Sequence, residues 1–255
     1  MPTIVACFKW VIDEAYIRQG SSGDIDFSSV SYKMSDYDRN AIEEAVRLRD
    51  AGGGTVIAAT VGVPEATKGV KDALSRGPDQ AYFIADPSFR ELEPSQTAAI
   101  LAGVIRSRIP GYDLVLCGEG SGDLYAQQVG SRLAERLGIP CIAFAQKLSL
   151  DGGQLVAERR VEGGVEVVSS PLPAVVTVLP DINTPRIPGV RDTLMASKKP
   201  VTTIPRGDVP EWVEPRLQTV GLAAARMDRT CERFEAGPAG VALFVEALRK
   251  KGVVA

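Results

Sequence analysis

The most constraining feature of this sequence is a regular alternation of short, continuously apolar runs with amphipathic stretches. The apolar runs are TIVACF at 3–8, TVIAATVG at 55–62, QAYFIAD at 80–86 and YDLVLCG at 112–118. Amphipathic stretches at 35–54, 64–78, 93–110 and 123–138 lie between or after them. Strands that are apolar along their whole length are typical of a parallel sheet covered on both faces. The alternation predicts an α/β fold with an open, mostly parallel sheet and flanking helices.

The pattern changes after residue 138. Strand-like segments at 143–150, 154–163 and 164–180 are joined by the turns DGG and EGG, which predicts a small antiparallel hairpin leading to a last core strand, Ala174 to Leu179. A proline-rich stretch follows, and AGPAGVALFVEALRKKG at 236–252 has the pattern of an amphipathic helix. We expect an α/β domain over residues 1–204 and an extended C-terminal arm over residues 205–255.

Composition excludes several kinds of chemistry. The sequence contains no histidine, which removes Ser-His-Asp and Cys-His catalysis and histidine-ligated zinc. Its cysteines, Cys7, Cys117, Cys141 and Cys231, are scattered and form no C-x-x-C pair, so we predict no metal site. The first three lie in or beside apolar runs, which indicates reduced core thiols in a reducing compartment. Any chemistry must therefore come from carboxylates, lysines, backbone dipoles or a bound cofactor, and the family resemblance given below implies no catalytic residue in this chain.

Charge and hydropathy indicate the setting. The formal net charge is −3, which offers no basic footprint for nucleic acid. No apolar run reaches the roughly 18–20 residues of a membrane span, and the start MPTIVACFKWVID lacks the features of a signal peptide. We therefore expect a cytoplasmic protein without a membrane span.

The segment CGEGSGDLYAQQVG at 117–130 is the strongest candidate for a ligand loop. It follows an apolar strand and leads into an amphipathic stretch. Gly118, Gly120 and Gly122 let backbone N–H groups turn toward an anion, and a helix beginning near Asp123 would add its partial positive charge. No lysine ends the loop, so it is not a Walker site. The alternative is a connection that holds nothing, with Asp123 as a helix N-cap.

Several segments resemble the beta subunit of electron transfer flavoproteins. DLYAQQVGSRLAERLGIP is similar to the signature helix of that family, and FKWVID to its opening K-x-V-x-D. DYDRNAIEEAVRLRD, VEGGVEVVSSPLPAVVTV, INTPRIPG and ASKKP resemble further family motifs in the same order, over about residues 1–204. The variant at 117–130, together with LSRGPDQA, is closest to the Fix-type subunits encoded with carnitine-pathway acyl-CoA enzymes.

The resemblance implies a partner and a cofactor. Family members pair with a larger alpha subunit, and the heterodimer carries FAD and passes electrons between flavoprotein dehydrogenases and other carriers. Acyl-CoA dehydrogenases or reductases and quinone-linked flavoproteins are the partner classes expected here. The beta subunit binds AMP in the ordinary type and a second FAD in the bifurcating type. Both ligands stay open for this chain, and the Fix-type resemblance favours the flavin and bifurcation.

The resemblance also implies site residues at strand ends and helix starts. Two departures stand out: the family's N-P is Ser35-Asp36 here, and its acidic cluster becomes Gly122-Asp123-Leu124-Tyr125. Tyr125 either stacks on a ligand ring or is a surface tyrosine. The expected nucleotide-binding set is Cys7, Phe8, Lys9, Ser35, Asp36, Tyr37, Asp38, Val61, Gly62, Ser121, Gly122, Asp123, Leu124, Tyr125, Ala126, Gln127, Gln128, Val129, Gly130, Ser131 and Arg132.

The stretch 183–199 resembles the family's recognition loop, which docks on partner dehydrogenases. Val190 is at the position of the apolar anchor, with Leu194 one turn further on. Arg191, Lys198 and Lys199 would steer the chain toward acidic surfaces. The alternative is that Val190 and Leu194 pack on this chain's own core. The C-terminal arm and its helix would pack on the alpha subunit.

Two other classes share this kind of sheet. An ATP-hydrolysing enzyme of the adenine-nucleotide alpha hydrolase type would need a loop such as S-G-G-x-D after the first strand, and ACFKWVIDEA lacks it. A nucleotide-binding stress protein would need a late G-x-x-G-x-x-x-x-x-x-x-G-[ST] loop, which the sequence does not contain. The resemblance predicts an electron carrier subunit rather than either of these.

Overall fold

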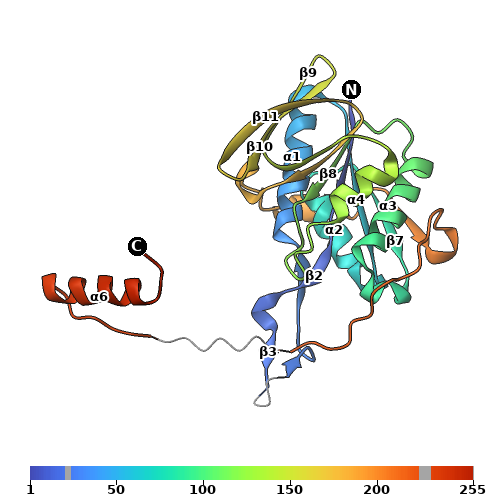
Figure 1. The fold of residues 1–255 in the computed structure, drawn as a ribbon. Helices are drawn as coiled ribbons and strands as arrows, with labels where there is room; N and C mark the ends of the chain where they lie inside the picture. The colour runs from blue at the N-terminus through green and yellow to red at the C-terminus, as the bar shows by residue number, and fades with distance from the viewer. Residues whose placement is uncertain (21–23, 224–230, 255) are drawn as a thin grey trace. The chain divides into compact units, whose positions relative to one another are not determined.

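The computed structural model describes residues 1–20, 24–223 and 231–254, which fall into two compact units (Figure 1). The larger unit comprises Met1–Arg18 and Asp26–Val220, and the smaller one comprises the described parts of Gln19–Ile25 and Gly221–Ala255. Each unit is treated by itself below.

The larger unit is built on an α/β sheet. Within the described residues this sheet has nine strands in the order β11-β10-β9-β12-β8-β1-β6-β7-β13. Neighbouring strands are parallel from β9 across to β13, whereas β9, β10 and β11 form an antiparallel meander. The predicted fold class is confirmed. The strands are β1 Thr3–Cys7, β6 Thr55–Gly62, β7 Gln80–Ala85, β8 Leu114–Gly118, β9 Cys141–Asp151, β10 Gln154–Val161, β11 Gly164–Pro171, β12 Ala174–Val178 and β13 Val201–Pro205.

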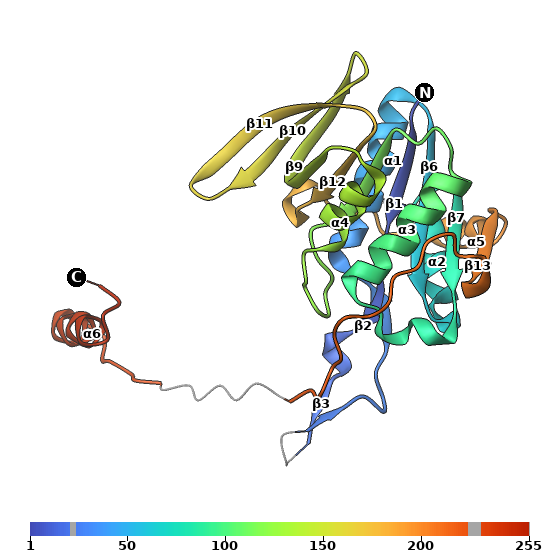
Figure 2. The same cartoon turned by 45° about the vertical axis from the view of Figure 1, so that its right-hand side comes forward.

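Helices cover both faces of the sheet (Figure 2). Helices α1 (Asp36–Gly52) and α2 (Thr67–Ser75) bury Ile42, Val46 and Leu74 on one face. Helices α3 (Pro94–Arg108) and α4 (Val129–Leu137) bury Ile100 and Leu133 on the other. Because both faces are covered there, the central strands β1, β6, β8 and β12 are apolar along almost their whole length, and this produces the continuous runs in the sequence.

Smaller elements complete the chain. The stretch 25–38, which reads as polar and turn-like, contains strands β4 and β5, and β5 pairs with β2 beyond the end of β1. The remaining elements are β2 Trp10–Ile12, β3 Arg18–Gln19, β4 Ile25–Asp26, β5 Tyr32–Met34, helices α5 Val190–Ala196 and α6 Pro238–Lys250, and 3-10 helices at Glu14–Tyr16, Pro64–Ala66, Pro87–Glu91, Pro180–Ile182 and Arg206–Asp208.

Strand β13 corrects one expectation. The run ending in β12 is not the last strand of the sheet, because Val201–Pro205 pairs in parallel with β7 at the far edge. Ile204 is buried against the α3 and α4 face. Pro205, which has no N–H to donate, occupies the last position of this edge strand, where a proline is tolerated.

Residues 206–217, here called the strap, cross the outside of α3. Glu211 forms ion pairs with Arg106 and Arg136, and the Trp212 ring stacks on Phe89 at a centroid distance of 6.1 Å. A Cβ atom on Gly103 of α3 would lie 2.8 Å from the Cβ of Glu211, so the close crossing requires a glycine there. The strap is therefore bound to the surface of the larger unit.

The predicted terminal helix is present as α6 in the smaller unit. Its aromatic residue Phe244 contacts Phe234 with ring centroids 5.5 Å apart, while Val241 and Leu243 are more than half exposed. Among the described residues, no helix is both long enough and apolar enough to cross a bilayer.

Two of the expected core thiols are buried and one is not. Cys7 and Cys117 lie in the core, whereas Cys141 is exposed because it is the first residue of β9 and precedes the strand's buried positions. Cys231 is also exposed.

Candidate functional site

The candidate site lies where the order of the sheet reverses. The chain passes from β1 outward to β6 and β7, and then returns to the other side of β1 to form β8. In open parallel sheets, ligands bind at the carboxyl ends of the strands beside such a reversal, because the connections diverge there. The residues that follow β1 and β8 are Phe8, Lys9 and the loop 118–128.

Asp38 joins the ends of these two strands. Its carboxylate accepts hydrogen bonds from the backbone N–H of Lys9 at 2.8 Å and of Gly118 at 3.1 Å. The side chain lies in the first turn of α1, and the residue is 7% exposed. Burial raises the pKa of Asp38 to about 7, against the effect of the two backbone donors. A Cβ on Gly118 would lie 2.6 Å from Oδ1 of Asp38, so this junction requires glycine.

A second set of contacts fixes the loop over the strand ends. The ammonium of Lys9 forms an ion pair with Asp123 at 2.6 Å. The N–H of Gly122 donates to the hydroxyl of Ser35, which is fully buried just before α1. Partial burial opposes ionisation of Asp123, but the charge and hydrogen bond of Lys9 lower the pKa of Asp123 below its ordinary value.

Tyr125 folds back over the loop. Its ring lies 5.2 Å from the ring of Tyr37, tilted by 44°, and a Cβ on Gly120 would lie 2.7 Å from its Cδ2. Tyr125 and Gln127 have φ values of 45° and 56°, in the left-handed region that favours glycine. Partial burial and a hydrogen bond with Glu119 raise the pKa of Tyr125 to about 12.

The left-handed residues explain a correction to the predicted helix. Helix α4 begins at Val129, not near Asp123, so residues 123–128 form a loop. Positive φ at Tyr125 and Gln127 is incompatible with an α-helix. Asp123 is consequently not a helix N-cap but the partner of Lys9, and Ala126 lies outside the helix whose buried face holds Leu133. Because α4 begins at Val129, the partial positive charge of its N-terminus lies near residue 129 and not at Asp123.

A match to a family model covers most of this arrangement. Residues 23–209 match the model of the electron transfer flavoprotein domain. This chain belongs to the electron transfer flavoprotein family. The matched range contains α1, the sheet strands from β6 to β13 and the loop 118–128, and it is consistent with a beta-type subunit.

The other residues expected at the nucleotide site of this flavoprotein are distributed around the strand ends. Cys7 and Phe8 are buried on opposite faces of the sheet, and Val61 and Gly62 end the neighbouring strand β6, half-buried. Asp36 is exposed and forms ion pairs with Lys33 and Arg39. The start of α4 carries the rest: Gln128, whose Oε1 accepts from Arg132 at 3.0 Å, half-buried Val129, buried Gly130 and exposed Ser131.

Glu119 is the loop residue that sequence reasoning missed. Its carboxylate accepts from Nε2 of Gln127 at 3.4 Å and hydrogen-bonds with the hydroxyl of Tyr125. The sequence did contain an indication of this role. Glu119 lies between Gly118 and Gly120 in a loop predicted to bind an anion, and a carboxylate in that place needs hydrogen-bond donors from other loop residues.

The donor set of this site fits a nucleotide. Lys9, paired with Asp123, offers a cation, Ser121 offers a hydroxyl, and Tyr37 and Tyr125 offer aromatic rings, all from connections after the strands or from the start of α1. The buried hydroxyl of Ser35 positions the loop through Gly122 and does not face a ligand. A Cβ added to Gly122 would meet nothing closer than 4.0 Å, so the loop has open space on that side. Among the described residues, no cluster of cysteine, aspartate and glutamate could hold a metal ion.

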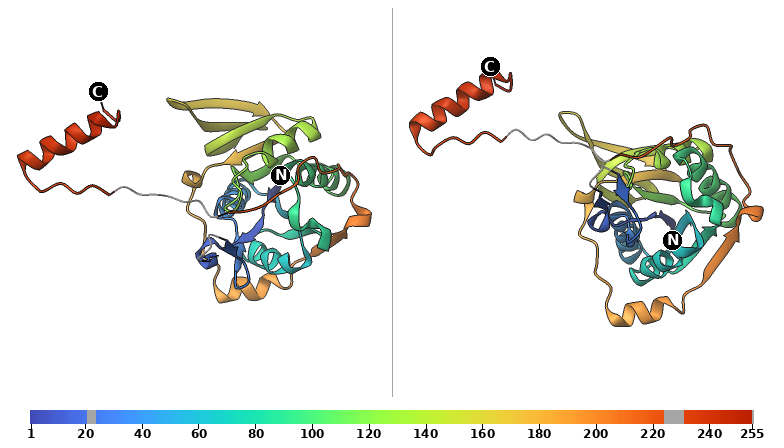
Figure 3. Two further views of the ribbon diagram at one scale, coloured as in Figure 1. Left: turned by 60° about the horizontal axis from the view of Figure 1, so that its bottom comes forward. Right: turned by 90° about the horizontal axis from the view of Figure 1, so that it is seen from below.

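The segment 183–199, which the family resemblance predicts to be a recognition loop and which is called the recognition segment below, is attached to the larger unit at both ends. At its start, Asn40 of α1 donates to the carbonyl of Asn183 at 2.8 Å, and Arg186 forms an ion pair with the buried Glu43. At its end, the ammonium of Lys199 donates to the carbonyls of Leu74 and Pro78 at 2.9 and 2.6 Å, which caps α2. Figure 3 shows the segment in light orange at the periphery of the larger unit, beside α2.

The tip of this segment is open to solvent. Val190 is 80% exposed and Leu194 is 65% exposed, so they do not pack into the core of this chain. Arg191 and Lys198 are exposed as well, whereas Lys199 is engaged by α2.

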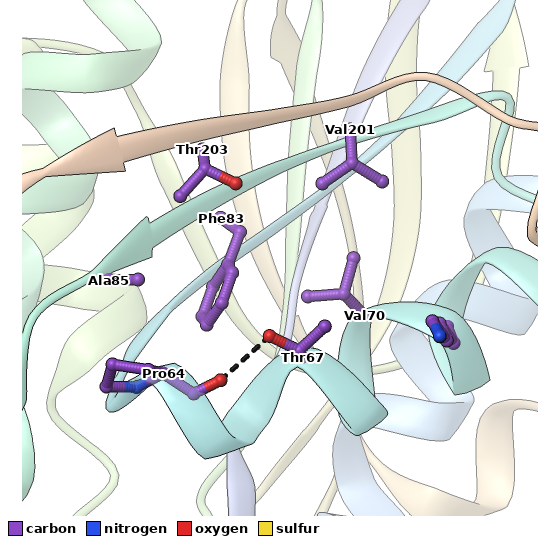
Figure 4. A pocket seen from close by; sticks show the side chains of 8 residues that line it. Pro64, Thr67, Val70, Phe83, Ala85, Val201 and Thr203 are labelled. Carbon is purple, nitrogen blue, oxygen red and sulfur yellow. Dashed lines mark hydrogen bonds between the residues drawn. The ribbon is translucent and has the colours of Figure 1, made fainter.

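Two grooves lie away from the loop. A mainly apolar groove of about 340 Å³ opens between α2, β7 and β13, and contains the side chains of Val70, Phe83 and Val201 (Figure 4). Another of about 440 Å³ lies between α1 and the start of the recognition segment, beside Arg39, Arg76 and Arg186. Neither contains a residue of the loop 118–128.

Proposed function

We propose that this chain is the beta subunit of a heterodimeric electron transfer flavoprotein, and that its switch-point site binds an adenine nucleotide, either FAD or AMP. The observation that carries the proposal is the junction at Asp38. One buried carboxylate holds the ends of β1 and β8 together and places Lys9 beside the loop 118–125. A cation, the Ser121 hydroxyl and two aromatic rings meet there.

The roles of the residues follow from their chemistry. Lys9 and the N–H groups of the loop offer charge and donors to phosphate, and the tyrosines offer a stacking surface to a ring. If the ligand is FAD, the flavin supplies the redox chemistry. The chain binds and orients that group, and its buried strand ends keep water from one side of it.

The flavoprotein partners are assigned to two surfaces. Within the expected arm 205–255, the strap 206–217 lies on this chain's own surface, so the part that follows the strap is assigned to the alpha subunit, with which a further FAD is shared. The exposed apolar residues of α6 suit a protein contact. The recognition segment docks redox partners, namely acyl-CoA dehydrogenases or reductases or quinone-linked flavoproteins. Val190 and Leu194 are its apolar contacts.

The Fix-type resemblance favours a second flavin with electron bifurcation. The cytoplasmic location proposed for the subunit rests on its scattered cysteines and on the lack of a membrane-span pattern in the sequence. Ser35-Asp36 and Tyr125, which replace residues of the ordinary family motifs, are the positions that support a departure from plain AMP binding.

The test is to co-express the chain with an alpha subunit, denature the purified heterodimer and identify the released nucleotides by chromatography and mass. One FAD with one AMP per heterodimer supports a single-flavin electron carrier. Two FADs support a working flavin in this site and make bifurcation the next measurement. A stable heterodimer that releases FAD in unit amount and no second nucleotide contradicts the proposed site.

A further inference from the structure

The conformation of Tyr125 is costly, which calls for a physical reason. A non-glycine residue in the left-handed region costs about 1–2 kcal/mol, and the loop contains two such residues, Tyr125 and Gln127. Strained backbone of this kind persists where surrounding contacts impose it, and it is concentrated at ligand sites. The contacts that impose it on Tyr125 are the ring of Tyr37 and the face of Gly120.

We propose that Tyr37 and Tyr125 form an aromatic wall that recognises the adenine ring of the nucleotide, and that Gly120 is the residue that keeps this wall in place. The proposal rests on the proposed nucleotide site and names the residues that read the base. Adenine is common to AMP and FAD, so the wall serves either ligand.

The geometry suits a flat, aromatic ligand group. Tyr125 is 44% exposed while its ring contacts Tyr37 and Gly120, so part of its surface is free to stack. The ring orientation is set by its packing on Tyr37 and on the face of Gly120. Lys9 is tied to Asp123, two positions earlier in the same loop, so that a cation for phosphate and a surface for a base belong to one segment. They are complementary to the phosphate and the base that a nucleoside monophosphate presents.

Gly120 offers a variant that displaces the wall without deleting a tyrosine. A methyl group there would lie 2.7 and 2.9 Å from Cδ2 and Cε2 of Tyr125, closer than carbon atoms approach. Gly122 is the matched control, because a methyl group at that position meets only Val11 Cγ2 at 4.0 Å. Both glycines are in the same loop, and neither has the positive φ that would strain an alanine.

The experiment measures binding of AMP, FAD and ribose 5-phosphate to the full chain by calorimetry, for the wild type and for Gly120→Ala, Gly122→Ala, Tyr125→Ala and Tyr125→Phe. Stacking of a base on an aromatic side chain predicts that Gly120→Ala and Tyr125→Ala weaken AMP binding about tenfold. Gly122→Ala and Tyr125→Phe should stay within about twofold of the wild type. Ribose 5-phosphate, which has no base, should bind equally to all five proteins.

Two results would overturn the inference in different ways. Equal AMP affinity in Gly120→Ala and the wild type, with binding intact, rejects the wall but leaves the nucleotide site standing. A wild-type chain that binds none of the three probes rejects the nucleotide site itself, and the wall with it.

Discussion

The carboxylate of Asp38 accepts a hydrogen bond from the backbone of Gly118, eighty residues away in the sequence, at 3.1 Å. The same carboxylate accepts from Lys9, so that a single buried side chain connects two parallel strands at their carboxyl ends. The loop 118–128, which we propose binds the nucleotide, begins at this junction.

Asp38→Asn should weaken that junction. An amide has one acceptor oxygen, so its NH2 group would face one of the two backbone donors. We expect the unfolding free energy to fall by about 1–3 kcal/mol, the cost of leaving a buried donor unpaired. Urea denaturation measures it. Asp36→Asn is the control, since its exposed ion pairs with Lys33 and Arg39 predict a change below about 1 kcal/mol. Equal losses in the two variants would contradict this role for Asp38.

The raised pKa of Asp38 predicts a pH dependence. In the folded chain, burial raises the pKa of Asp38 from 3.8 to about 7. Between these values the folded state binds more protons than the unfolded state, so this group's stabilising contribution is lost as pH rises from about 4 to about 7. The charges of Lys9 and Asp123 act on the pKa of Asp38, and the charge of Asp38 in turn acts on the thiol of Cys117.

The measurement is the unfolding free energy of the wild type and of Asp38→Asn at several pH values in that window. The unfolding free energy of the wild type minus that of Asp38→Asn should decrease as the pH rises toward 7 and then become constant. A difference that grows with pH would mean that Asp38 ionises more easily in the folded chain.

Gly103→Ala should release the strap. The added methyl group would lie 2.8 Å from Cβ and 3.0 Å from the backbone N of Glu211, and neither atom is the end of a flexible side chain. In a Trp10→Phe background, Trp212 is the only remaining tryptophan. Its emission should shift to longer wavelength as it leaves Phe89, and proteolysis at 206–217 should accelerate. Gly52→Ala, which meets nothing within 4 Å, should leave both readouts unchanged.

Lys199→Met should be far more costly than Lys198→Met. Lys199 donates to three carbonyls at the end of α2, and loss of charged hydrogen bonds of this kind costs about 1.5–3 kcal/mol. Lys198 is exposed, and its substitution should change the unfolding free energy by less than about 0.5 kcal/mol. Thermal denaturation separates them. Similar melting temperatures for both variants would show that the cap contributes little.

Val190→Ser should leave the chain stable but weaken its docking. Because Val190 is 80% exposed, the unfolding free energy should change by less than about 0.5 kcal/mol. Loss of an apolar contact at the centre of an interface typically costs more than 1 kcal/mol, so reduction by a partner dehydrogenase should slow about fivefold or more. Stopped-flow flavin absorbance of the heterodimer measures the rate. An unchanged rate would remove Val190 from the docking surface.

The sheet was predictable because its signal is local and redundant. Runs such as TVIAATVG are apolar at every position, and each was followed by a helical pattern. Strand β13 carried no such signal. Val201, Thr202 and Thr203 are exposed on the edge of the sheet, so the run VTTIP reads as an ordinary extended stretch. Its pairing with β7 depends on contacts more than a hundred residues away in sequence.

The candidate site was predictable in outline and not in its connections. The alternation of strands and helices predicted that the site lies at the carboxyl ends of the strands. The resemblance to the family motif predicted that Asp38 belongs to the site. The start of α4 could not be placed, because DLYAQQ has ordinary helical composition and only the packing of Tyr125 on Gly120 and Tyr37 imposes left-handed backbone there. The ion pair of Lys9 with Asp123 depends on that same turn.

The double attachment of the recognition segment has a consequence for the thermodynamics of docking. A flexible loop must give up conformational entropy when it binds, which subtracts from the affinity. Here Asn183 and Arg186 at one end and Lys199 at the other restrict the segment during folding of the chain itself. Under the proposed docking role, a partner would therefore meet a preorganised apolar tip, and weak, rapidly reversed contacts with several partners would be compatible with a defined orientation.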